Sequence, residues 1–323
     1  MAYLTRGFLV LAIAVTPAIA VDVEAELAAM LAARPEADTN GDGVLTEDEA
    51  ADYMVRVRRK GRVNTGPGIR NRALIDAYEE GEHGRLLYRL MRPLEVEPDE
   101  RYPLVVSLHG SGGTGDDNLS NLRVWNGYMA RQSWREKYPS YVLVPQHRGG
   151  EIWGPKPDVP EAATLYVRDS FPDLLDLIDG MLAELPIDPD RIYVLGSSGG
   201  GVGTWNLLAA KPEMFAAAIP VCAARPVRHA ERLTGIPIWI FHGGADPLAP
   251  VKSSRGSFRA LKDLGGNVKY TELDGVGHNS WIQAFQYRGD DEAKGYITHY
   301  GSAANDRTAD VWGWLFSKRR ERN

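Results

Sequence analysis

The chain has 323 residues, of which 44% are hydrophobic and 25% are charged, a composition typical of a globular protein with a large core. It carries 37 Lys and Arg against 43 Asp and Glu, so the formal charge at pH 7 is −6. This balance excludes the strongly basic surface with which proteins bind nucleic acids or anionic membranes. Cys222 is the one cysteine, which excludes an intramolecular disulfide and a cysteine-based zinc site.

Residues 1–20 have the pattern of a secretory signal peptide. Arg6 is the one charge in this segment, residues 7–15 are apolar, and Ala18-Ile19-Ala20 is a small-x-small cleavage site. The apolar run is shorter than the roughly 20 residues that a membrane span needs. We therefore expect a cleaved leader, a secreted or periplasmic protein, and no membrane attachment after cleavage.

Residues 38–49, DTNGDGVLTEDE, match the calcium loop of an EF-hand at every specified position. Oxygen ligands at alternate positions of such a loop converge on one ion, and a glycine at the sixth position permits the sharp turn. The predicted calcium ligands are the side chains of Asp38, Asn40, Asp42, Thr46 and Glu49 and the main-chain carbonyl of Val44. We expect residues 21–55 to form a small helical EF-hand module with a structural Ca²⁺, its entering helix interrupted by Pro35. An acidic turn that holds no ion is the alternative.

Residues 56–72, RVRRKGRVNTGPGIRNR, are basic and contain Gly and Pro, which predicts a solvated linker. From residue 73 to residue 320, short apolar runs alternate with helical patterns, without a long-period repeat. Such alternation predicts a catalytic α/β domain with a doubly wound, mostly parallel sheet. The predicted strands are 86–91, 104–108, 141–144, 191–195, 216–221, 238–241 and 268–273, and the predicted helices are 171–185, 202–210, 253–264 and 309–318.

Three of these strands are followed by the residue types of a serine hydrolase triad. Ser198 lies in the G-x-S-x-G sequence 196–200 between a predicted strand and a predicted helix, the setting that a nucleophile elbow requires. Asp246 and His278 each follow a later strand, in the chain order Ser, Asp, His. A histidine there takes the serine proton, and a carboxylate orients the histidine. Of the other histidines, His242 is predicted to have a structural role in its loop.

Residues 109–113, HGSGG, form a glycine-rich loop after another predicted strand. The oxyanion of an acyl-transfer intermediate needs two aimed main-chain N–H donors. We expect the amides of Ser111 and Gly199 to form this oxyanion hole, with Gly110 as the alternative to Ser111. Phosphate binding by the loop is not favoured, because the chain contains no G-x-x-x-x-G-K-[ST] motif.

Five motifs of this region occur together in one known group of enzymes. They are YPLVVSLHG at 102–110, GDDN at 115–118, GSSGGGVGTW at 196–205, HGGADP at 242–247 and GHNSW at 277–281. Through them, residues 73–320 resemble the α/β-hydrolases of the polyhydroxybutyrate-depolymerase-like and carbohydrate-esterase group, which includes feruloyl and acetylxylan esterases. The resemblance implies an α/β-hydrolase fold and ester hydrolysis through an acyl-enzyme. Members of the group typically carry a large residue, often Met, where this chain has Gly199.

We therefore expect a secreted serine esterase that acts on a small ester or on an ester-decorated polysaccharide and needs no cofactor for catalysis. A serine peptidase of the prolyl-oligopeptidase-like branch shares the triad, but the segment before residue 73 is too short for a propeller gate. A calcium-dependent surface-binding protein with a silent hydrolase domain is the third class. The oligomeric state stays open.

Aromatic side chains near the predicted loops are candidates to line a substrate cleft, because aromatic faces suit sugars and phenolics. Trp153 and Trp281 are the predicted substrate contacts, and Trp125 and Tyr166 lie in similar positions. Packing in the core is the alternative for each of them.

Overall fold

The computed structural model describes residues 23–46, 49–50, 53, 68–148, 153–154, 170–223 and 227–320. The predicted signal peptide and most of the predicted linker lie outside the described residues, so these two predictions stay predictions. No helix in the described part of the chain is long and apolar enough to cross a membrane.

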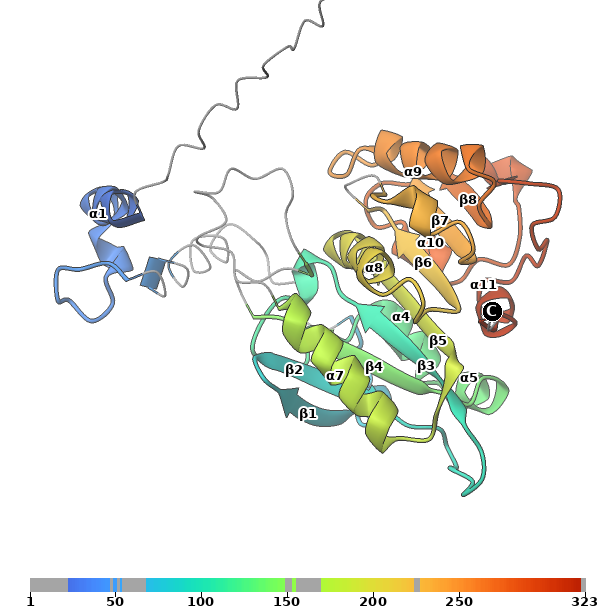
Figure 1. Cartoon of the computed structure of the whole chain (residues 1–323), viewed down its shortest axis with the longest axis horizontal. Helices are drawn as coiled ribbons and strands as arrows, with labels where there is room; N and C mark the ends of the chain where they lie inside the picture. The colour runs from blue at the N-terminus through green and yellow to red at the C-terminus, as the bar shows by residue number, and fades with distance from the viewer. Residues whose placement is uncertain are drawn as a thin grey trace, which may run out of the picture.

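The centre of the molecule is a nine-stranded sheet with the order β1-β2-β4-β3-β5-β6-β7-β8-β9 (Figure 1). Strands β3 to β8 are parallel to one another, and antiparallel pairs β1–β2, β2–β4 and β8–β9 complete the two ends. The strands are β1 (Glu79–His83), β2 (Leu86–Met91), β3 (Tyr102–Leu108), β4 (Tyr141–Gln146), β5 (Ile187–Ser197), β6 (Ala217–Val221), β7 (Ile238–Gly243), β8 (Val268–Leu273) and β9 (Tyr296–Tyr300). The predicted mostly parallel α/β sheet is therefore confirmed.

Helices cover both faces of the sheet, with α7 in front of the strands in Figure 1. One face carries α7 (Phe171–Glu184), α8 (Gly199–Ala210) and α9 (Val251–Asp263), and the other carries α4 (Val124–Met129), α5 (Gln132–Lys137), α10 (Trp281–Ala284) and α11 (Val311–Phe316). The remaining helical segments are α1 (Val23–Ala33), α3 (Arg72–Ile75) and the 3₁₀ turns η1 (Pro35–Ala37), η2 (Ser111–Gly113), η3 (Ala230–Arg232) and η4 (Glu292–Lys294).

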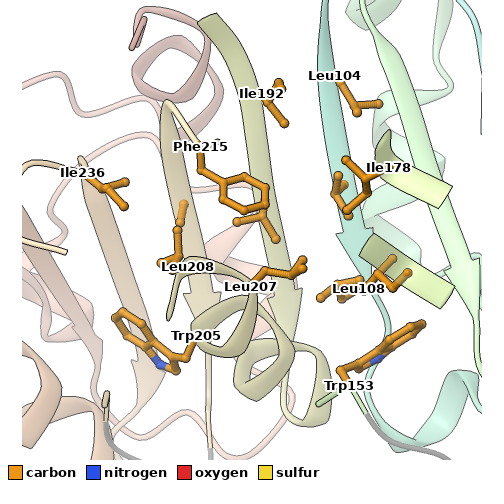
Figure 2. Packing of buried hydrophobic residues seen from close by; sticks show 14 of the residues in the cluster. Leu104, Leu108, Trp153, Ile178, Ile192, Trp205, Leu207, Leu208, Phe215 and Ile236 are labelled. Atoms are coloured by element: carbon orange, nitrogen blue, oxygen red, sulfur yellow. The ribbon is translucent and has the colours of Figure 1, made fainter. Parts of the chain in front are cut away.

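The central strands are apolar on both sides because both sides are buried. On β3, Leu104 and Val106 face one core cluster and Val105 faces the other. Figure 2 shows Ile178 of α7 and Leu207 of α8 packed over the first of these faces. Burying one such side chain stabilises the fold by about 1.5–3 kcal/mol. This two-sided packing fixes the ends of the strands from which the candidate site is built.

The predicted strands 86–91 and 268–273 coincide with β2 and β8, and the five others overlap β3 to β7. The four predicted helices overlap α7, α8, α9 and α11. Strands β1 and β9 at the two edges of the sheet and the short helices α4, α5 and α10 were not predicted from the sequence. These elements are short, and neighbouring elements order them.

The N-terminal segment has a small apolar cluster of its own. Helix α1 ends at Ala33, and Pro35 begins the turn η1, so the proline interrupts the helix as predicted. Around this turn pack the buried residues Ala37, Leu45, Ala50 and Tyr53 and the partly buried Leu27, Met30 and Leu31. This cluster places the loop that begins at Asp38 next to a local apolar base.

Candidate active site

Ser198 lies at a sharp turn between β5 and α8 and has a strained backbone, with φ 56° and ψ −116°. The flanking glycines make this turn possible. A Cβ at Gly196 would lie 2.4 Å from the Gly200 carbonyl oxygen, and a Cβ at Gly200 would lie 2.1 Å from that of Leu108. Only glycine fits at either position, so strand and helix approach closely and present Ser198 at the carboxyl edge of the sheet.

The structure brings the three predicted triad residues into one chain of contacts. His278 Nε2 lies 3.0 Å from Ser198 Oγ, and His278 Nδ1 lies 2.8 Å from Asp246 Oδ2. Each residue follows the carboxyl end of a different parallel strand, β5, β7 or β8. Such nucleophile–base and base–carboxylate contacts have the geometry that a serine hydrolase needs.

The Asp246 carboxylate has no solvent exposure. Its Oδ1 accepts hydrogen bonds from the amides of Leu248 at 2.8 Å and Ala249 at 2.9 Å. Burial by itself raises the pKa of Asp246, but the amide donors and His278 outweigh burial and hold the pKa below its usual range. Asp246 is therefore ionised near neutral pH and can stabilise a protonated His278.

The predicted oxyanion loop lies against the nucleophile. A Cβ at Gly110 would lie 3.1 Å from the Ser198 Cβ, and a Cβ at Gly199 would lie 3.8 Å from the Ser111 amide nitrogen. Ser111 and Gly199, the two expected donors, are thus neighbours beside Ser198. The space next to Gly199 is open, because no atom outside its immediate chain neighbours lies closer than that amide.

A polar network, part of it buried, holds the oxyanion loop in place. The Gln146 side chain donates to the Gly113 carbonyl at 2.9 Å, and Arg123 donates to that of Gly112 at 3.1 Å. His109 Nδ1 lies 2.7 Å from the Gly110 carbonyl. Burial lowers the pKa of His109 well below its usual range, so the ring is neutral and donates through Nδ1. Gln146 and Arg123 could not be found from local sequence patterns, because their partners lie 33 and 11 residues away along the chain.

Trp153 belongs to this support. Its side chain is buried, and its indole N–H donates to the His109 carbonyl at 3.0 Å. Its ring also packs against the rings of His109 and His147, with centroids 5.1 and 4.5 Å apart. The indole is used for packing and for a hydrogen bond to the loop, and the substrate contact predicted for Trp153 stays a prediction.

The other aromatic candidates differ in their burial and in their contacts. Trp281 is partly buried, and its ring meets the His278 ring edge-on with centroids 5.7 Å apart. It stays a candidate substrate contact. Trp125 is buried and donates to Ser107 Oγ at 2.9 Å, so it is a packing residue. Tyr166 lies outside the described residues.

Cys222 lies at the end of β6, and its sulfur comes within 4.8 Å of ligand atoms of both Asp246 and His278. Burial raises the pKa of this thiol to about 12. Because the thiolate is the reactive form, Cys222 is inert near neutral pH. It does not compete with Ser198 as a nucleophile.

The segment predicted to bind calcium forms a compact loop. Asp38 Oδ2 accepts from the Gly43 amide at 2.9 Å, and Gly43 has the positive φ of 80° that the sixth loop position requires. The Glu49 carboxylate bends back over the loop, accepting from the Thr39 and Thr46 hydroxyls at 2.9 Å each. Hydrogen bonds from Thr46 and Thr39 lower the pKa of Glu49 to about 2. A donor set made only of oxygen atoms fits a calcium ion.

Known proteins match the part of the chain that carries this site. The family model of phospholipases and carboxylesterases matches residues 94–288, which include all three triad candidates. The solved structure of a thermostable esterase is similar with a TM-score of 0.61 and 32% identity, covering 76% of this chain and 64% of that one.

Two curated proteins are similar over a shorter part of the chain. Acyl-protein thioesterase 1 of Neurospora crassa is 28% identical over 206 residues, which cover 55% of this chain and 81% of that protein. The protein NocK of Nocardia uniformis subsp. tsuyamanensis is 30% identical over 153 residues, 47% of this chain and 42% of that protein. The chain thus spans less than half of the length of NocK.

Proposed function

Because the chain belongs to the phospholipase/carboxylesterase family, we propose that it hydrolyses carboxylic esters with Ser198 as nucleophile. The observation that carries this proposal is the continuous contact chain from Ser198 Oγ through His278 to Asp246. In the proposal His278 is the general base, and Asp246 orients it and stabilises its protonated form.

The reaction proceeds in two halves. Ser198 Oγ attacks the acyl carbon while His278 Nε2 takes the hydroxyl proton, and the carbonyl oxygen becomes an oxyanion near the amides of Ser111 and Gly199. The intermediate collapses to an acyl-enzyme, and His278 returns the proton to the leaving alcohol. Water then attacks the acyl carbon while His278 takes one of its protons, the bond between the acyl carbon and Ser198 Oγ breaks, and His278 returns the proton to Oγ, which releases the carboxylic acid and restores the Ser198 hydroxyl.

The proposed substrate is a small ester or an ester group on a polysaccharide, met outside the cytoplasm. The signal-peptide pattern of residues 1–20 supports export. The aromatic face of Trp281 beside His278 supports binding of a sugar or a phenolic group next to the base. A hydrolysis screen over acetyl, feruloyl, glucuronoyl and hydroxybutyrate esters identifies the preferred acyl group.

We propose a separate structural role for the loop at residues 38–49. Asp38, Asn40, Asp42, Thr46, Glu49 and the Val44 carbonyl would hold Ca²⁺, which neutralises the carboxylates that face one another there. The ion supplies charge and local order and takes no part in ester hydrolysis.

The test of the proposed function is the substitution Ser198→Ala, assayed with nitrophenyl acetate and with a peptidyl anilide. Loss of the nucleophile lowers kcat for the ester by at least about 10³-fold while the circular dichroism spectrum stays unchanged. Ser197→Ala, at the preceding residue, is the matched control and should keep most of the activity. Activity on the anilide exceeding that on the ester supports a peptidase instead, and full ester activity in Ser198→Ala contradicts the proposal.

A further inference from the structure

A second histidine contacts the carboxylate of Asp246. His242 lies at the carboxyl end of β7, and its side chain is fully buried. Its Nε2 is 3.2 Å from Asp246 Oδ2, the same oxygen that contacts His278 Nδ1 at 2.8 Å. Its Nδ1 is 2.7 Å from the hydroxyl of Ser254 in the first turns of α9. From the sequence, His242 is predicted to have a structural role in its loop, with no connection to the triad.

The surroundings of His242 select one tautomer. Nε2 faces two acceptors, Asp246 Oδ2 and the Ala249 carbonyl at 3.1 Å, so the proton must be on Nε2. Nδ1 then carries a lone pair and accepts from the Ser254 hydroxyl, which can rotate to donate. In this arrangement every polar atom of the buried ring has a partner. The Nε2–H donates to the Ala249 carbonyl and also lies beside the carboxylate oxygen Oδ2 of Asp246, at 3.2 Å.

The charge state of His242 matters as much as its position. Burial lowers the pKa of His242, so the ring is neutral. The charged groups that face it are Asp246 and His278, and Glu272 lies opposite His242 in the register of β7 and β8. Glu272 is already paired with Arg255 of α9. A neutral His242 can hold the Asp246 carboxylate without neutralising its negative charge. That charge stabilises His278 when His278 is protonated.

Four contacts therefore fix the Asp246 carboxylate. The amides of Leu248 and Ala249 hold Oδ1, and the imidazoles of His242 and His278 share Oδ2. Without His242, the contact between Oδ2 and His278 would be the remaining side-chain contact at that oxygen among the described residues.

We infer that His242 is a positioning residue of the proposed triad, which holds Asp246 Oδ2 toward His278 as a neutral N–H donor whose tautomer is set by Ser254. The inference rests on the proposed function, because it assigns His242 a role only through Asp246 and His278. It predicts an effect on turnover that packing of the loop alone would not produce.

The test compares two substitutions that place an amide differently. In His242→Asn the shorter side chain reaches the position of Nδ1 and leaves Asp246 without the donor, whereas in His242→Gln the amide nitrogen reaches the position of Nε2. We expect kcat of His242→Asn to fall about 10- to 100-fold with KM nearly unchanged, as for the loss of one buried hydrogen bond to a charged group. His242→Gln should recover activity to within about tenfold of wild type.

The pH profile gives a second readout. With one donor fewer, Asp246 Oδ2 carries more negative charge and favours protonated His278. The acid limb of kcat/KM should therefore move to higher pH in His242→Asn, and the low-field proton resonance of the His278–Asp246 hydrogen bond should shift. In Ser254→Ala the hydroxyl that donates to Nδ1 is lost, so the tautomer of His242 is no longer selected. The acid limb and the proton resonance should shift in the same direction as in His242→Asn. This variant replaces His242→Asn in the test if His242→Asn does not fold.

Two reference variants distinguish the role of His242 from the role of the triad itself. Thr271→Val removes a buried hydroxyl that accepts from Trp239 Nε1 at 2.9 Å, and it should lower Tm without changing kcat or the acid limb. Asp246→Asn tests the triad itself. If Asp246→Asn is inactive while both His242→Asn and Ser254→Ala behave like wild type, the inference is overturned and the triad stands. Full activity of Asp246→Asn overturns the triad.

Discussion

Gly200 on α8 packs directly against the backbone of Leu108 at the end of β3, where an added Cβ would lie 2.1 Å from the carbonyl oxygen. Gly199, one residue earlier, has an open environment in which the nearest atom, the Ser111 amide nitrogen, would lie 3.8 Å from a Cβ. Gly199 and Gly200 therefore have different roles. Gly200 closes the elbow against the sheet, and Gly199 leaves space at the predicted oxyanion hole.

This difference predicts opposite results for two alanine substitutions. Gly200→Ala should destabilise the fold by at least about 3 kcal/mol, because the clash is with rigid backbone. Gly199→Ala should stabilise the fold by about 0.4–1 kcal/mol. Gly199 does not have a positive φ, so alanine fits its native backbone, and the substitution reduces the conformational entropy of the unfolded chain. Chemical denaturation of both variants measures the effect. Equal losses of stability in the two variants would show that close packing of Gly200 against β3 is not needed for the turn at Ser198.

Trp153 provides a prediction that separates a supporting role from a substrate contact. Trp153→Phe keeps the ring but leaves the buried His109 carbonyl without the indole donor, at a cost of about 1–3 kcal/mol. Since that carbonyl belongs to the oxyanion loop, we expect kcat to fall about tenfold while KM stays nearly constant.

The matched control for Trp153→Phe is Trp134→Phe. The indole nitrogen of Trp134 is buried and has no hydrogen-bond partner within the described residues. Loss of this indole N–H in Trp134→Phe should leave kcat unchanged. A rise in KM for Trp153→Phe with kcat unchanged would support the substrate contact that the sequence suggested.

Much of the sheet and the triad geometry follow from local sequence, and the limits have physical reasons. The apolar runs of β2 and β8 are recognisable because buried parallel strands and their neighbours exclude polar side chains. The edge strand β1 has the sequence EEGEH and is mostly exposed, so its order comes from pairing with β2. No local pattern encodes such pairing.

The same distinction applies to the candidate site. Ser198, Asp246 and His278 could be predicted because each follows a recognisable strand in a fixed order. The contact between His242 and Asp246 is set by how the turn after β7 folds back toward α9, and the support of Gly113 by Gln146 joins residues 33 apart. Packing of Trp153 against His109 and His147 depends likewise on tertiary contacts, which no local pattern encodes.

Lys269 predicts an unusual dependence of stability on pH. This β8 residue is 1% exposed, its Nζ lies 3.4 Å from the centre of the Trp239 ring, and it donates to the Thr308 carbonyl at 2.9 Å. Burial lowers the pKa of Lys269 to about 7. An unfolded lysine has a pKa of about 10.4, so between about pH 7 and pH 10 the unfolded chain binds one proton more than the native chain. Stability from this group therefore rises with pH across that window.

Lys269→Met keeps an unbranched apolar side chain against Trp239 and removes the titrating group. The free energy of unfolding of this variant should vary less between pH 7 and pH 10 than that of wild type, and the difference between the two should shrink as pH rises. Urea denaturation at several pH values measures it. Lys262→Met, at an exposed position of α9, should follow the wild-type curve. Parallel curves for Lys269→Met and wild type would show that Lys269 is charged in the native state throughout.

The loop proposed to bind calcium is self-contained. The hydrogen bonds given above for Asp38 and Glu49 all stay within residues 38–49, and the apolar cluster beneath them involves residues between Leu27 and Tyr53. A serine triad needs no metal. We therefore expect calcium to order the N-terminal segment without changing turnover, with a Kd of about 10⁻⁴ to 10⁻³ M, as in extracellular calcium modules.

A chelator should leave kcat for a small ester nearly unchanged and raise protease sensitivity between residues 22 and 60, as mapped by mass spectrometry of limited digests. Glu49→Gln should reproduce this sensitivity in the presence of calcium, because a neutral amide cannot supply the paired carboxylate oxygens that close the shell. Glu36→Gln is the control, since Glu36 lies outside the loop and its oxygen that accepts from the Tyr53 hydroxyl is retained in glutamine. A fall in kcat on calcium removal that is reversed by adding calcium back would show that the loop gates the active site.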